Sequence, residues 1–135
     1  NDNLYRIITK YIESLYYTGY ENPKWILVDE AQFLTKKQVE ELAAIADNFG
    51  ISIICYGLRT DFQTNLFEGS KHLFALADEF EHIETLCEMD GCDRKAVAHI
   101  RYINGVRDES ETSVAIETGD VSYKSVCRKC WRNQK

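Results

Sequence analysis

The sequence predicts an α/β fold, in which part of a doubly wound parallel sheet is followed by a small β lobe rich in cysteine. Two short apolar runs, residues 25–28 and 51–56, are typical of strands covered on both faces. A segment with helical periodicity, 35–49, joins them through short connections, and this order favours a parallel pair with a right-handed crossover. Four of the five cysteines lie after residue 86. The predicted domains are therefore an α/β core over 1–84 and a second lobe over 85–135, within the size that 135 residues allow.

Two helices are predicted from the spacing of apolar residues. The first covers about 3–17 and ends near Gly19. The second begins at Thr35, which forms a capping box with Gln38, and ends at Gly50. The apolar stripe of the first helix contains Leu4, Ile7, Ile8, Tyr11, Ile12 and Leu15. The stripe of the second contains Val39, Leu42, Ala43, Ile45, Ala46 and Phe49.

Further elements are expected beyond the second strand. Ser70 is predicted to cap a third helix. The apolar face of that helix would contain Leu73, Phe74, Leu76, Ala77 and Phe80. Short β-like runs at 97–103 and 114–116 predict the strands of the second lobe.

Composition excludes several classes of protein. The net charge of −6 and a pI near 5.1 argue against a nucleic-acid-binding surface, which is usually basic. No apolar run approaches the roughly 20 residues of a membrane span, and no secretory signal opens the chain. We therefore expect a cytoplasmic protein whose cysteines bind a metal rather than form disulfides. The opening residues, Asn-Asp-Asn-Leu, are not a natural start and predict a fragment.

The first chemical motif is the acidic pair Asp29 and Glu30, which directly follows the first apolar run. In open α/β sheets the carboxyl ends of strands carry the functional groups. One carboxylate can hold a hydrated Mg²⁺ ion, and the next can orient or deprotonate a nucleophile in phosphoryl transfer. The alternative is that the pair merely begins a solvated loop. The phosphate-binding motif G-x-x-x-x-G-K-[ST] is absent, since 67–71 lacks its first glycine, and truncation at the N-terminus explains the absence most simply.

The second motif consists of two close cysteine pairs, Cys87 with Cys92 and Cys127 with Cys130. Four thiolates on two turns can form a closed tetrahedral shell, which suits zinc. A redox pair at Cys127 and Cys130 is the main alternative, but no thioredoxin-like strand-to-helix context precedes it. Cys55 lies in a predicted strand and is expected to be a small core residue.

Four boxes in this order resemble the type II, zinc-containing thymidine kinase family in its bacterial form. They are residues 26–34, 56–62, 92–96 and 123–130. The resemblance runs from about Lys24 to the C-terminus. It implies the C-terminal portion of a phosphate-loop (P-loop) kinase core, without the P-loop itself, joined to a zinc knuckle that anchors a loop called the lasso.

In such an enzyme the γ-phosphoryl group of ATP passes to the 5′-hydroxyl of thymidine or deoxyuridine. The resemblance implies that Glu30 is the general base and that Asp29 is the acid of the magnesium site. The residues implied to bind ATP with Mg²⁺ are Asp29, Glu30, Ala31 and Gln32. It also implies a structural zinc, a homotetramer, thymidine and ATP as substrates, and no nucleic-acid or membrane partner. The fragment alone is expected to be inactive.

The resemblance further implies how the base is held. Phe33, Leu58 and Phe62 would line the pocket from the core side, and Tyr123 would close it from the lasso together with the backbone around Ala115, Ile116 and Glu117. From the residues alone, the four side chains read as ordinary packing or edge positions.

Three departures from the family pattern stand out. The first cysteine pair is separated by four residues, where shorter gaps are usual, and Cys130 is a histidine in some relatives. The family's Ile-Gly-Gly becomes Ile116-Glu117-Thr118-Gly119, which restricts positive φ angles. Two other classes stay open: a stand-alone zinc-binding interaction module, and a fragment of another Asp-Glu-box ATPase such as a helicase.

Overall fold

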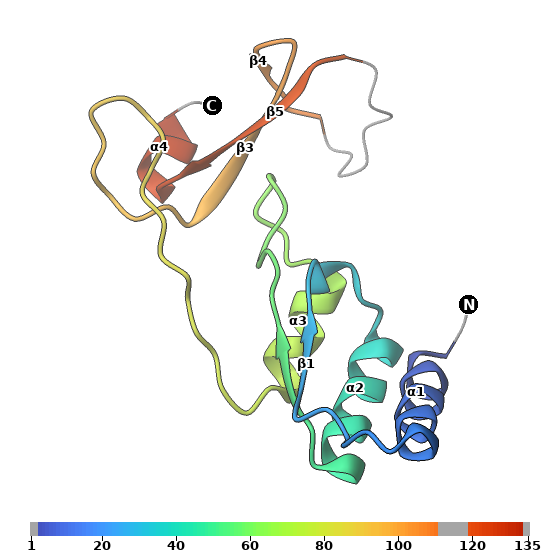
Figure 1. Cartoon of the computed structure of the whole chain (residues 1–135). Helices are drawn as coiled ribbons and strands as arrows, with labels where there is room; N and C mark the ends of the chain where they lie inside the picture. The colour runs from blue at the N-terminus through green and yellow to red at the C-terminus, as the bar shows by residue number, and fades with distance from the viewer. Residues whose placement is uncertain (1–2, 111–118, 134–135) are drawn as a thin grey trace. The chain divides into compact units, whose positions relative to one another are not determined.

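The computed structural model describes residues 3–110 and 119–133. The chain divides into two compact units. The first comprises Asn1–Arg59 and Phe67–Phe80, and the second comprises Thr60–Leu66 and Glu81–Lys135. Figure 1 shows the helices and parallel strands of the first unit and the antiparallel strands of the second. The fold is therefore mixed α/β, with one parallel and one antiparallel sheet.

The first unit contains a parallel strand pair, as predicted. Its elements are α1 (Leu4–Thr18), β1 (Trp25–Val28), the 3₁₀ helix η1 (Ala31–Phe33), α2 (Lys36–Phe49), β2 (Ser52–Cys55) and α3 (Glu68–Leu76). Trp25 of β1 lies opposite Ser52 of β2, and Val28 lies opposite Cys55. This register brings the ends of both strands, and the loops that follow them, to one edge of the sheet.

The helix signals in the sequence are confirmed for α1 and α2. Asn3 caps α1 by accepting a hydrogen bond from the Arg6 amide, and Gly19 ends it with φ at 78°. Thr35 and Gln38 form both halves of the predicted capping box of α2. Gly50 ends α2 with φ at 63°, a backbone conformation that glycine adopts without steric cost.

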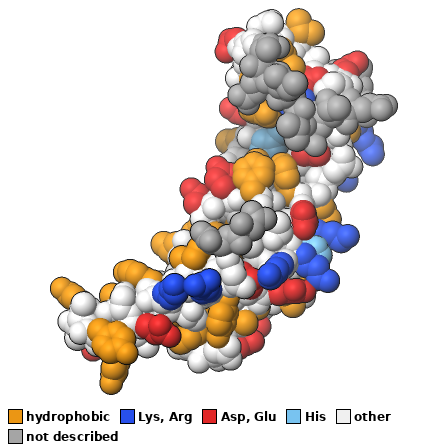
Figure 2. All heavy atoms as spheres, turned by 90° about the vertical axis from the view of Figure 1, so that its right-hand side faces the viewer, with side chains coloured by type: hydrophobic (Ala, Val, Ile, Leu, Met, Phe, Trp, Pro, Cys, Tyr) orange, Lys and Arg blue, Asp and Glu red, His pale blue; other side chains and the backbone are white. Residues whose placement is uncertain are grey.

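The core of the first unit is smaller than the apolar pattern predicts. Ile12, Ile45 and Ile51 form a buried cluster, and Ile26 and Ile53 pack against it from the sheet. Since α1 and α2 cover only that face, the prediction of strands covered on both faces is wrong. The apolar side chains left exposed on the strands and on α1 include Trp25, Leu27, Ile54, Ile7 and Tyr11. Figure 2 shows exposed hydrophobic side chains on the face that α1 presents.

The third helix begins earlier and ends earlier than predicted. Its N-cap is Phe67 rather than Ser70, and it ends at Leu76, so Phe80 lies beyond it. Ser70 is buried inside the helix, where its hydroxyl donates a hydrogen bond to the Leu58 carbonyl at 2.6 Å. The capping prediction is therefore wrong because this hydroxyl binds a distant loop instead of the helix's own first turn.

The second unit is built on a three-stranded antiparallel sheet in the order β4-β3-β5. Its elements are β3 (Ala98–Ile103), β4 (Val106–Arg107), β5 (Val121–Val126) and α4 (Arg128–Asn133). The predicted run at 97–103 is confirmed, whereas the predicted strand at 114–116 lies outside the described residues. The core contains Ile100 and Val126 together with Cys87 and Cys127. None of the helices described in either unit is both long enough and apolar enough to cross a membrane.

Candidate active site and metal centre

The acidic pair lies on the turn that directly follows β1. Glu30 has φ at 52° and ψ at 34°, which is left-handed backbone that a non-glycine residue rarely adopts. Its amide donates a hydrogen bond to the Asp29 carboxylate at 2.8 Å, and the next amide, of Ala31, donates to the Tyr56 carbonyl at 2.8 Å. Both carboxylates are exposed. Strained backbone held by such contacts is typical of functional turns.

Gln32 links this turn to the loop after β2. Its side chain is almost fully buried, at 2% exposed. The amide nitrogen donates to the Glu30 carboxylate, and the amide oxygen accepts from the Leu58 amide at 3.1 Å. One side chain therefore fixes both the orientation of Glu30 and the position of Leu58. The predicted ATP contacts of Ala31 and Gln32 stay predictions, and in this structure both residues are buried.

Two glycines allow the close approach of these segments. A Cβ atom on Gly57 would lie 2.5 Å from the Gln32 amide oxygen and 2.9 Å from its backbone nitrogen. A Cβ atom on Gly69 would lie 2.3 Å from the Ala31 carbonyl oxygen. Sequence reasoning missed Gly57, Gly69 and Ser70 as supports of the site. The available signal was the presence of two glycines after β2, Gly57 in the loop and Gly69 in α3, since glycine often marks a close approach of two backbones.

The predicted core-side residues Phe33 and Leu58 lie in the first unit with the acidic pair. Phe33 is 70% exposed, and its ring meets that of Phe67 edge-on with centroids 5.7 Å apart. Leu58 is 44% exposed, although its backbone is held by Gln32 and Ser70. Large apolar side chains exposed beside a fixed carboxylate are available to a ligand.

Phe62 differs, because it belongs to the second unit. The expectation that it lines the base pocket from the core side stays a prediction. The loop that carries it is braced by Asp61, whose carboxylate accepts from the amides of Gln63 and Asn65, both at 2.9 Å. The Phe62 carbonyl accepts a hydrogen bond from Trp131 Nε1 at 3.0 Å, and Trp131 lies on α4. Backbone hydrogen bonds of this kind are invisible in the sequence pattern.

The remaining predicted nucleoside contacts lie near the C-terminus. Tyr123 is on β5, opposite Arg101 of β3, and is 55% exposed. Ala115, Ile116 and Glu117 lie outside the described residues.

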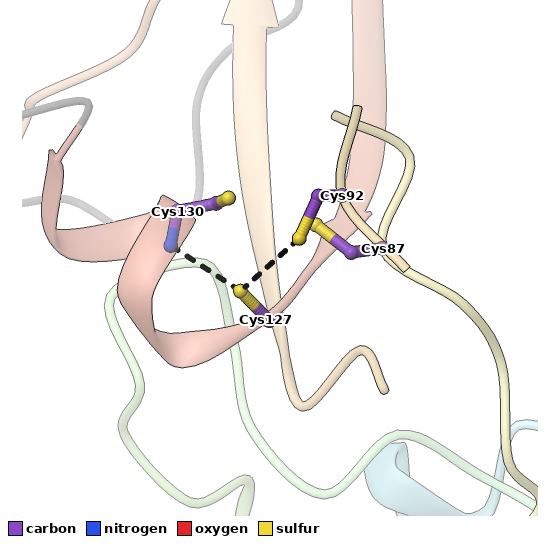
Figure 3. A group of neighbouring side chains, drawn as sticks. All are labelled: Cys87, Cys92, Cys127 and Cys130. Atoms are coloured by element: carbon purple, nitrogen blue, oxygen red, sulfur yellow. Dashed lines mark hydrogen bonds between the residues drawn. The ribbon is translucent and has the colours of Figure 1, made fainter. Parts of the chain in front are cut away.

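The four predicted metal ligands meet in the second unit. Their sulfur atoms all lie within 4.8 Å of one another, and Figure 3 shows the side chains converging. Cys92 and Cys127 are 3.9 Å apart at sulfur. A tetrahedral zinc with bonds of about 2.3 Å requires sulfur atoms about 3.8 Å apart, so the donor set fits such an ion. Cys127 and Cys130 come from the end of β5 and from α4, and the other pair lies on the turn before β3.

Hydrogen bonds favour the thiolate form at part of this cluster. The Cys130 amide, which donates to the Cys127 sulfur at 3.4 Å, lowers the pKa of Cys127 to about 6. The backbone and then the side chain of Arg94 lower the pKa of Cys92. Burial, followed by the neighbouring sulfurs, raises the pKa of Cys130 to about 12. Cys127 therefore ionises more readily than Cys130, unless a cation replaces the protons of both.

The sequence of the chain matches a known protein family. The sequence model of the family described as "Thymidine kinase" matches residues 5–131. Similar proteins include the thymidine kinase of Streptococcus thermophilus strain CNRZ 1066, 47% identical over 82% of this chain and 55% of the relative. The thymidine kinase of Pasteurella multocida is 50% identical over 76% of this chain and 52% of its own length. The thymidine kinase of Streptococcus pyogenes serotype M3 strain MGAS315 is 42% identical over 84% of this chain and 58% of its own length. The chain thus spans about half the length of the curated relatives it matches, and it belongs to the thymidine kinase family.

Proposed function

We propose that this chain is the nucleoside- and metal-binding half of a thymidine kinase, which transfers the γ-phosphoryl group of ATP to the 5′-hydroxyl of thymidine. The observation that carries the proposal is the Gln32 side chain, which binds both the Glu30 carboxylate and the Leu58 amide. A group that accepts a proton and a loop that touches the nucleoside are thereby fixed relative to each other. Such fixed positioning supplies most of the catalysis in phosphoryl transfer.

The carboxylates would have separate roles. Glu30 would accept the proton of the 5′-hydroxyl as its oxygen bonds to the γ-phosphorus and the bond to ADP breaks. Asp29 would hold the hydrated Mg²⁺ ion, which neutralises charge on the ATP phosphates when bound. The ATP phosphates themselves would be held by a P-loop core supplied by a preceding segment. We use "complete kinase" for the protein that carries both parts, and we expect this chain alone to be inactive.

The base would contact the side chains of Phe33, Leu58, Phe62 and Tyr123. The backbone around Ala115, Ile116 and Glu117 would bind the polar edge of the ring. Backbone groups matched to thymine or uracil disfavour cytosine, because its exocyclic amine would leave buried donors unpaired.

The cysteine cluster would hold one structural zinc. A shell of four thiolates leaves no open position, so the ion would fix the fold of the second unit without entering the reaction. A cytoplasmic location, a homotetramer and the absence of nucleic-acid partners are carried over as proposals. Membership of the thymidine kinase family disfavours the two alternative classes, a stand-alone zinc module and a helicase fragment.

A nucleoside kinase assay tests the proposal. The complete kinase should phosphorylate thymidine with ATP, should act far less on deoxycytidine, and should require Mg²⁺. This chain alone should give no product. Equal activity on the two nucleosides, or none on thymidine, would contradict the proposed substrate.

A further inference from the structure

A buried ion pair in the second unit has no part in the chemistry described so far. It joins Arg101 of β3 to Asp108, and the two side chains are only 4% and 6% exposed. Arg101 Nε donates to the Asp108 carboxylate at 2.5 Å, and Nη2 contacts the same oxygen and the Ser110 hydroxyl. Burying two charges removes their hydration, so such a pair is weak support for stability alone. A role in placing other groups is the better-attested use of buried ion pairs.

The guanidinium group of Arg101 also lies against Phe62. Its central carbon is 4.0 Å from the centroid of the ring, well within the range of a cation–π contact. The planar face stacks on the ring while the edge binds Asp108, a combination that lysine cannot reproduce. The ring of Phe62 is thus held by a cation whose own orientation is fixed by a buried carboxylate.

The same pair also organises the backbone beside the Phe62 loop. Asp108 accepts a hydrogen bond from the Ser110 amide at 2.9 Å. The Ser110 carbonyl in turn accepts from the Gln63 side chain at 2.6 Å. Together with the Trp131 bond to the Phe62 carbonyl, these contacts fix the loop at its aromatic residue and at the residue that follows it.

Phe62 borders a cavity of about 610 Å³ within this unit, whose lining also includes Asp108, Ser110 and Trp131. That volume is in the range of small-molecule sites. The Phe62 side chain is only 9% exposed, and a planar ligand would meet its ring where it lines this cavity.

We propose that Arg101 is a positioning residue for nucleoside binding, which sets the Phe62 ring at the angle that receives the base. The inference rests on the proposed function, because it requires Phe62 to contact the nucleoside. It predicts that weakening the Arg101–Asp108 pair loosens the loop over 60–66 and weakens thymidine binding without slowing the chemical step.

The test uses Arg101→Lys and Asp108→Asn, two variants that weaken the pair from opposite sides. If one fails to fold, the other still tests the proposal. Each should speed hydrogen exchange at residues 61–66 and raise KM for thymidine about tenfold, the scale of a desolvated cation–π contact. Both kcat and KM for ATP should stay within about twofold in the complete kinase, since a loss of folded enzyme would lower kcat instead.

The matched control is Lys95→Gln, which breaks an exposed ion pair with Glu84 in the same unit. It should change neither exchange nor KM. Phe62→Leu should raise KM for thymidine, and combining it with Arg101→Lys should add little, because both changes remove one contact. If Phe62→Leu raises KM but the Arg101 and Asp108 variants do not, the inference fails while the proposed function stands. If Phe62→Leu leaves KM unchanged, the proposed base contact fails and the inference with it.

Discussion

The side-chain oxygen of Gln32 accepts a hydrogen bond from the Leu58 amide at 3.1 Å. The two residues follow different strands, and this bond joins the turns at their ends. Because the nitrogen of the same amide group binds Glu30, a shift in the position of one turn displaces the other turn as well. The proposed base and one proposed nucleoside contact therefore share a single support.

Replacing the proposed base tests the chemistry directly. Glu30→Gln in the complete kinase should lower kcat by roughly a hundredfold or more, the scale of general base catalysis, because an amide cannot accept the hydroxyl proton. Thymidine binding, measured by calorimetry, should persist. Glu40→Gln is the control, since this glutamate is exposed on α2 in a weak pair with Lys36. A variant at Glu30 with normal kcat would remove it as the base.

Steric crowding at Gly69 should disturb the turn that carries Glu30. Gly69→Ala places a methyl group against the Ala31 carbonyl, and relief of that overlap should cost about 1–3 kcal/mol of stability. It should also reduce activity by displacing the turn that carries Glu30. Gly50→Ala is the comparison, because nothing lies within 4 Å of its added carbon although its φ is +63°. It should cost about 1–2 kcal/mol through backbone strain alone and leave KM and kcat of the remaining folded enzyme unchanged. Chemical denaturation and steady-state kinetics separate the two effects.

The metal prediction is independent of any nucleoside. Protein prepared without added zinc should contain about one equivalent by elemental analysis. Cys127→Ser should abolish stoichiometric zinc and destabilise the second unit, since the ion stabilises only the folded ligand set. Cys55→Ser should keep the zinc, because Cys55 lies on β2 in the first unit. Protein that contains no zinc as prepared and has a disulfide among the four cysteines would contradict a zinc site.

Acid should weaken the second unit partly through His99. Burial lowers the pKa of this half-buried imidazole from its ordinary value of 6.5, while the charge of Glu88 acts in the opposite direction. Its Nδ1 atom has no hydrogen-bond partner among the described residues. In the unfolded chain the imidazole takes up a proton at higher pH than in the folded chain. Stability is therefore full above about pH 6.5 and is lost as pH falls below it.

The matching measurement is the melting temperature of His99→Gln and of the exposed His82→Gln, at about pH 7.5 and about pH 5.5 with excess zinc. His99→Gln should lose less stability on acidification than the unaltered chain, and His82→Gln should behave like the unaltered chain. The same acid sensitivity in all three proteins would mean that His99 is not responsible.

The parts of the fold that depend on local chemistry were predictable. The Thr35 capping box and the Gly19 and Gly50 helix ends depend on residues close together in sequence. The parallel strand pair was predictable from two apolar runs joined by one helix. The four cysteines could be grouped because two close pairs are typical of the ligands of one tetrahedral ion.

The errors concern contacts between distant segments. Serine is a common N-cap residue, yet the Ser70 hydroxyl donates a hydrogen bond to the carbonyl of Leu58, twelve residues earlier in the chain. Phe62 follows a core strand in sequence, and nothing in the sequence shows the contact of its ring with Arg101 or the hydrogen bond from Trp131 that group it with the second unit. No periodicity reports which of two units a loop joins, because that choice depends on long-range partners.

The uncovered side of the parallel sheet has a practical consequence for anyone who purifies this chain. Trp25 and Leu27 of β1 are 60% and 66% exposed, beside Ile54 of β2. Apolar side chains grouped on an open strand surface adhere to one another and to column matrices. Light scattering of the isolated chain should therefore rise with protein concentration, and Leu27→Lys should reduce it. Assays of the isolated chain are best made dilute, where self-association does not obscure metal binding.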